Sequence, residues 1–182
     1  MKLKSLKKVK QQRRVVLLAL YLLKHLAGDS QPAKRKVLRY ITSNRLMHIP
    51  ASDERRRSNS EPTWMNDLAW KRADLKDDGF LNMPDNGIWQ ITDHGERDVE
   101  QWAQRVKEAA ESKPNWREDF KAHWAPDAEI DDDFHNDYYI TEETIQWAIK
   151  IASGALKTPM PARSFTQSIE QAMGLSSSDA TS

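Results

Sequence analysis

The sequence contains no cysteine, which excludes disulfides, thiolate zinc sites, iron–sulfur clusters and cysteine nucleophiles, and suits a reducing cytoplasm. Only six of the 182 residues are glycine, and no glycine-rich phosphate-binding loop is present. The longest hydrophobic run, residues 15–23, is nine residues long, whereas a bilayer span needs about 20. Lys24 and His25 interrupt this run and no small-residue cleavage site follows closely. We therefore expect a buried helix here rather than a signal peptide or a membrane segment.

Patterns typical of catalytic and metal sites are also missing. The five histidines show no metal-ligand spacing, and no serine lies on a recognisable nucleophile elbow. An acidic segment, residues 127–137, has neither the bend glycine nor the distal glutamate of a calcium loop, and we interpret it as a solvated loop. The sequence predicts a protein that is not an enzyme and that holds no metal and no cofactor.

Charge is divided sharply between the two parts of the chain. Residues 1–57 hold 16 Lys and Arg against 3 Asp and Glu, whereas residues 58–182 hold 12 against 24. The net charge of +1 hides this division. Because a strongly basic segment attracts polyanions, the N-terminal part is expected to face a nucleic acid, and the rest would repel it.

The pattern of apolar residues and breakers predicts a mainly α-helical chain. Gly28 and Gly79 are helix stops, Asn86-Gly87 favours a hairpin turn, and Thr92 is an N-cap. We expect helices at 10–26, 33–46, 63–78 and 93–112 and strands at 80–83 and 88–91. This is the order of a winged helix, in which the third helix is presented to the major groove and the hairpin is the wing.

We divide the chain into four segments. These are a basic arm (1–9), a winged-helix domain (10–112), a helical C-terminal extension (113–175) and a disordered tail (176–182). In the extension, Thr141 caps a helix at 142–153, and a capping box opens another at 165–173. An aromatic stripe at Trp116, Phe120 and Trp124 is typical of a core or a dimer face.

The segment 64–95 resembles the N-terminal domain of Mrr-type modification-dependent restriction proteins. The resemblance rests on Trp64, Asn66, Trp70 and Leu75, then on Asp78-Gly79-Phe80, and above all on the motif Gly87-Ile88-Trp89-Gln90-Ile91-Thr92 with Gly95. It extends loosely over about residues 9–104. It implies a winged helix that binds DNA in a restriction or defence system.

The chain departs from this family in two respects that bear on function. The third helix, usually rich in Arg, Lys and Gln, carries Asp67 and Asp74 beside Lys71 and Arg72, which weakens direct base readout. The nuclease domain is replaced by an unrelated segment: Asp127 is followed by no acidic-x-Lys or Gln-x-Lys. We therefore predict a DNA reader or regulator without nuclease chemistry.

Three basic clusters, none with an acidic residue inside it, are expected to flank the backbone of double-stranded DNA. The predicted phosphate contacts are Lys8, Arg13, Arg14, Lys34, Arg35, Arg55, Arg56 and Arg57. The residues predicted to lie near bases are Asn66, Asp67, Trp70, Lys71 and Asp74 on the third helix, and Asn86 at the wing tip.

Two alternatives stay open at this point. Trp64 and Trp70 fit a core or capping role, or else a surface that stacks on an extruded base. The third helix, where acids outnumber bases, fits docking on a protein as well as on DNA, which would make the chain an interaction scaffold.

The C-terminal helices are too short to be stable alone, so we expect them to pack on the first helix or to form a homodimer.

Overall fold

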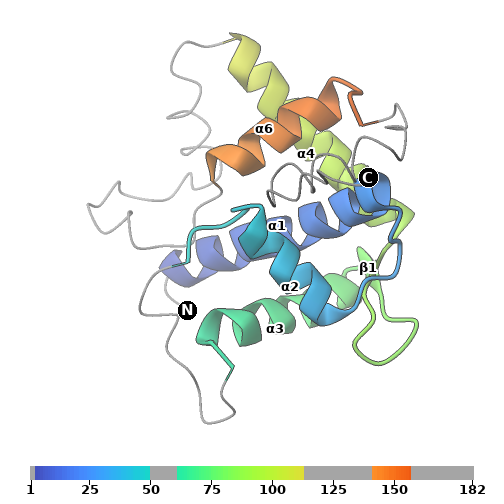
Figure 1. Ribbon diagram of the computed structural model, residues 1–182. Coiled ribbons are helices and arrows are strands. Elements are labelled where there is room, and N and C mark those ends of the chain that lie inside the picture. The colour runs from blue at the N-terminus through green and yellow to red at the C-terminus, as the bar shows by residue number, and fades with distance from the viewer. Residues whose placement is uncertain (1–2, 50–60, 113–140, 157–182) are drawn as a thin grey trace, which may run out of the picture.

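The computed structural model describes residues 3–49, 61–112 and 141–156. Its elements are, in order, α1 (Leu3–Ala27), α2 (Lys34–Ser43), α3 (Thr63–Asp77), β1 (Leu81–Asn82), β2 (Gln90–Ile91), α4 (Asp93–Ser112) and α6 (Glu142–Ala152). The strands pair antiparallel, with Leu81 opposite Ile91 and Asn82 opposite Gln90. Figure 1 shows α4 and α6 crossing above α1, and α2, α3 and the hairpin below it. The expected mainly α-helical fold with a two-stranded hairpin is confirmed and is compatible with a winged helix.

The helix ends differ from expectation in two places. α1 begins at Leu3 rather than at residue 10, so the basic segment continues the helix; no glycine or proline interrupts it before Gly28. α2 ends at Ser43 rather than at residue 46. The Asn44 side chain donates to the Tyr40 carbonyl (2.9 Å), and Arg45 has a left-handed φ of 50°, which turns the chain away from the helix.

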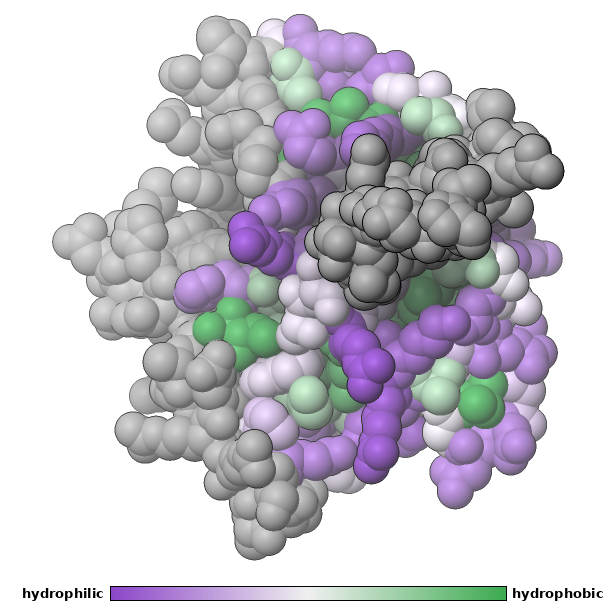
Figure 2. All heavy atoms as spheres, viewed as in Figure 1, coloured by the Kyte–Doolittle hydropathy of each residue, from purple (hydrophilic) through white to green (hydrophobic). Residues whose placement is uncertain are grey.

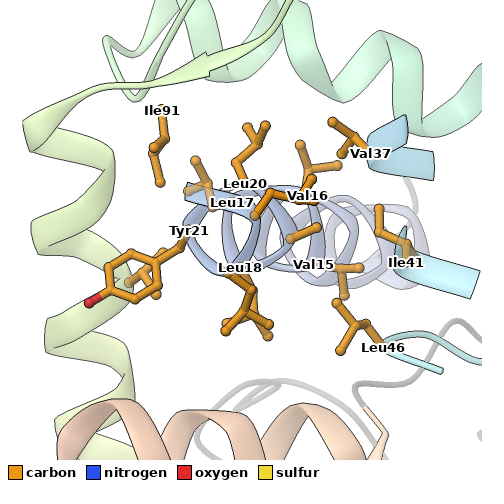
Figure 3. Close-up of a cluster of buried hydrophobic side chains, with 14 of the residues drawn as sticks. Val15, Val16, Leu17, Leu18, Leu20, Tyr21, Val37, Ile41, Leu46 and Ile91 are labelled. Carbon is orange, nitrogen blue, oxygen red and sulfur yellow. The ribbon is translucent and has the colours of Figure 1, made fainter. Parts of the chain in front are cut away.

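α1 is surrounded on every side. All nine residues from 15 to 23 are buried, none more than 2% exposed. The helix packs against α2, α3, α4 and β2, and in the close-up its side chains radiate in all directions (Figure 3): Tyr21 points toward α4, whereas Leu18 points toward α6. A helix that is apolar all round is expected to be buried all round, which accounts for the run of apolar residues.

α6 belongs to the same hydrophobic core. It packs on α4, and Ile145, Ala148 and Ile151 join the cluster that contains the α1 residues. The buried Thr144 hydroxyl donates to the Leu46 carbonyl (2.7 Å), beside the turn that follows α2. Of the two packing alternatives expected for this helix, the structure contains the intramolecular one. The expected helix at 165–173, the aromatic stripe, the acidic loop and the tail lie outside the described residues.

The joint between the hairpin and α4 explains the motif that carries the family resemblance. Gly87 has a φ of 75°, which the turn requires, and Trp89 is fully buried. The Thr92 hydroxyl donates to the Gly79 carbonyl (2.8 Å) and accepts from the Gly95 amide (3.1 Å), which caps α4. A Cβ on Gly95 would lie 2.3 Å from the Phe80 carbonyl oxygen, so a larger residue would push α4 off the strand. The motif therefore fixes the packing of the wing against α4.

Candidate nucleic-acid interface

Charged side chains are spread over the surface of the described residues. No group of three His, Asp or Glu side chains comes together among them as potential metal ligands. No helix within 3–49, 61–112 or 141–156 is long and apolar enough to cross a membrane. Figure 2 shows a mainly hydrophilic described surface with a few isolated hydrophobic residues in the region where α2, α3 and the hairpin lie. The distribution of charge over these elements is thus the feature to interpret.

The two cations predicted on the first helix are engaged within the fold. Arg13 forms an ion pair with Asp78, directly after α3. The Arg14 guanidinium donates to the Asp98 carboxylate of α4 (2.6 Å) and lies over the Trp102 ring, 5.2 Å from its centroid. The Arg14 side chain is only 11% exposed. Burial lowers the pKa of Arg14, and the attraction of Asp98 opposes that effect. This placement favours a structural role for both residues over the phosphate contacts expected of them.

α2 carries four basic residues and no acidic one: Lys34, Arg35, Lys36 and Arg39. Val37, Leu38 and Ile41 form its buried face, so the cations lie on the opposite face and at its start. Two of them have acidic neighbours: Lys34 pairs with Glu61 (3.3 Å) and Lys36 with Asp29 (2.5 Å).

Arg35 and Arg39 differ from these two lysines in having no acidic partner among the described residues. Both are exposed, and neither forms an ion pair with a carboxylate elsewhere in the described part of the chain. They are four residues apart, so their side chains leave the helix side by side, with Cβ atoms about 5–6 Å apart. We call Arg35 and Arg39, with the helix surface between them, the α2 face. It is an outward pair of guanidinium groups with the geometry to contact neighbouring phosphates.

The start of α2 is bonded to the wing. The Lys34 amide donates to the Gly87 carbonyl (2.8 Å), and the Trp89 amide donates to the Pro32 carbonyl (3.0 Å). Ala33 and Ile88 form a bridge between the two segments. Asn86, predicted to contact DNA, is exposed at the turn, where its amide donates to the Asp85 carboxylate (2.6 Å). The α2 face and the wing turn are therefore held together as one surface.

α3 presents a different surface. Trp64, Leu68 and Leu75 are its buried face, which settles the Trp64 alternative in favour of the core. Trp70 lies on the outer side with 65% of its surface exposed. Lys71 is largely covered and pairs with Asp74 (3.2 Å), whose side chain is 44% exposed.

Further along α3, Lys76 and Asp77 are both exposed. Asn66 and Asp67, near its start, are partly buried. Five of the six residues predicted to lie near bases thus share a helix on which acidic and basic residues are equal in number.

Not every predicted contact can be placed. Arg55, Arg56 and Arg57 and the side chain of Lys8 lie outside the described residues. Arg39, not included among the predicted contacts, is brought beside Arg35. The signal was present in the sequence: residue 39 follows residue 35 by four on a helix whose other face is apolar.

The described residues define a small helical domain with a two-stranded hairpin and one cationic helix face. Residues 17–101, from the buried part of α1 into α4, match the family described as the Mrr N-terminal domain. The resemblance seen in the sequence is confirmed by this match. A search of curated proteins and a search of solved structures gave no match.

Proposed function

We propose that this protein binds double-stranded DNA, without itself being an enzyme, as a reader or regulator associated with a restriction or defence system. The observation that carries the proposal is the α2 face: Arg35 and Arg39 point outward from a helix that has no acidic residue. The match to the Mrr N-terminal domain gives the restriction context.

The physical basis is the release of counterions from DNA. Each cation that neutralises a phosphate releases condensed counterions, so the logarithm of affinity falls with the logarithm of salt concentration by about 0.9 per contact. Arg35 and Arg39 suit this role because a guanidinium binds phosphate with paired N–H donors. Lys34 and Lys36 lie next to them, but Glu61 and Asp29 offset their charge, so the two arginines are the main cations of this surface.

A gel-shift titration of the full chain at several salt concentrations, on plain and methylated duplexes, tests the proposal. We expect salt-dependent binding, and we expect replacement of Arg35 and Arg39 by alanine to reduce the salt slope by about 2. A matched control replaces Arg105 and Lys150, two exposed cations on α4 and α6, and should leave the slope unchanged. No binding at low salt, or an equal loss in both double variants, would contradict the proposal.

The second candidate function is a scaffold that docks on another protein through α3. It is favoured by Trp70, an exposed aromatic residue on the outer side of a helix that also presents Asp74 and Asp77. Exposed tryptophans are enriched among residues that dominate protein interfaces. If the chain fails to bind either duplex at any salt concentration, this candidate takes precedence.

A homodimer through the C-terminal helices stays a prediction. Ile145, Ala148 and Ile151 of α6 are covered within one chain, whereas Trp147 and Ile149 are only partly buried and would be available to a dimer. Light scattering on the full-length protein measures the mass directly, and a monomer at all concentrations would remove the prediction.

A further inference from the structure

We propose that the domain meets DNA with the α2 face and the adjoining wing turn, while α3 is held away from the major groove. The inference rests on the proposed DNA binding and concerns only which surface touches the duplex. A winged helix ordinarily presents its third helix to the groove, so this is a different docking mode on the same fold.

The charge of α3 argues against insertion. α3 has no net charge, because its three acidic residues are balanced by three basic ones: Asp67, Asp74 and Asp77 against Lys71, Arg72 and Lys76. Lys71 is largely covered and pairs with Asp74, whose side chain is 44% exposed, and Asp77 is exposed. Carboxylates facing the groove would lie within about 8–10 Å of phosphates on both sides, a distance at which screening by salt is incomplete. Lys76 and the partly buried Arg72 offset these carboxylates but give α3 no net positive charge, whereas α2 has four basic residues and no acidic one.

α3 is also fixed in its orientation. Leu68 and Leu75 are fully buried, which sets the rotation of the helix about its axis. At its end, the ion pair between Arg13 and Asp78 ties the segment to α1. A rotation that turned the acidic side away from an approaching duplex would break this packing, so α3 presents the same residues in the bound protein.

The α2 face has the opposite properties. Its guanidinium groups are exposed, and the described residues place no carboxylate in ion-pair contact with them. The two hydrogen bonds to Gly87 and from Trp89 hold the wing turn beside the start of α2. The wing brings no cation of its own, since residues 80–91 contain none, and its turn carries the exposed Asp85 carboxylate. It therefore contributes shape and amide groups but no attraction for phosphate. Phosphate contact is therefore assigned to α2.

The first experiment compares two double variants of the full chain on one duplex, by fluorescence anisotropy at several salt concentrations. Asp74→Asn with Asp77→Asn should change Kd by less than twofold and leave the salt slope unaltered. Arg35→Ala with Arg39→Ala should weaken binding about tenfold and flatten the slope. Removing Asp74 also releases Lys71 from its ion pair. If α3 lay against phosphates, the variant would therefore bind DNA more tightly, both because a negative charge is lost and because a lysine becomes available. A tenfold tighter complex of the asparagine variant would overturn the inference.

A second readout reports on α3 directly. Trp70 is far more exposed than the buried Trp64, Trp89 and Trp102. Because the chain has three further tryptophans, the signal of Trp70 is taken as the difference in acrylamide quenching between the wild-type protein and a Trp70→Phe variant. We expect this component to stay equally accessible when saturating DNA is added. Shielding of Trp70 by DNA would place α3 in the complex and refute the proposed docking mode.

The results separate the two levels of the proposal. If the wild-type chain shows no salt-dependent binding, DNA binding itself fails and the docking mode fails with it. If the chain binds DNA but the aspartate variants and Trp70 respond while the arginine variant does not, only the assignment to α2 is wrong. A response of the arginine variant alone supports both.

Discussion

α1 and α2 are neighbouring helices that both carry arginine, but they use it in opposite ways. On α1, Arg13 and Arg14 pair with Asp78 and Asp98, residues that are distant in sequence. On α2, Arg35 and Arg39 point to solvent from a helix with a single buried face. A cluster of cations in a sequence therefore does not identify a binding surface until the carboxylates that fold against it are known.

The largest effect on stability is expected from a substitution in the buried part of α1. Leu18→Ala removes a fully buried side chain that points toward α6, and should lower the free energy of unfolding by about 3 kcal/mol. Urea unfolding followed by circular dichroism measures it. Leu26→Ala, near the partly buried end of α1, is the matched control and should cost clearly less. Equal losses would mean that α1 is not enclosed as described.

The next effect concerns the internal arginine. Arg14→Met keeps an unbranched apolar stem but leaves the partly buried Asp98 carboxylate without its partner, so we expect a loss of about 2 kcal/mol. DNA affinity, measured where the variant is folded, should stay within twofold. A stable variant with strongly weakened DNA binding would restore Arg14 as a phosphate contact.

A smaller effect distinguishes one tyrosine on each helix. Burial and Glu100 raise the pKa of Tyr21, and burial alone raises the pKa of Tyr40. The folded protein then retains protons that the unfolded chain loses above pH of about 10, so stability falls as the pH rises past that value. Tyr21→Phe should remove more of this alkaline loss than Tyr40→Phe. Unfolding curves at pH 8 and at higher pH compare them, and identical pH dependence in both variants would contradict the assignment.

The smallest effect is expected on the outer side of α2. Replacing Arg35 and Arg39 by alanine breaks no ion pair among the described residues and should change the unfolding free energy by less than about 0.5 kcal/mol. Urea unfolding followed by circular dichroism, as for Leu18→Ala, measures both this double variant and Arg14→Met. A loss as large as that of Arg14→Met would show that the α2 face stabilises the fold.

Much of the fold follows from local sequence signals. Thr141 caps α6 as predicted, and Asn86-Gly87 forms the hairpin turn, because caps and turns depend on a few adjacent residues. The predicted end of α2 was less accurate, because the helix is ended by a hydrogen bond from the Asn44 side chain and by the left-handed backbone of Arg45.

The candidate site is harder to derive from sequence. In the sequence, Arg14 and Arg35 both lie in basic clusters without an acidic residue. Only the fold brings Asp98, 84 residues away, against Arg14. The position of α6 was open for the same reason, because the buried bond from Thr144 to Leu46 joins residues 98 apart. Long-range pairings of this kind leave no periodic signal.

The joint between the wing and α4 has a consequence for how this domain can change over time. Gly87, Trp89, Thr92 and Gly95 are held by packing and capping, and each of them is directed at the inside of the domain or at a turn. None of them lies on the outer side of α2. That surface can consequently accumulate substitutions, and so acquire new ligands, while the joint keeps the architecture and its sequence signature intact.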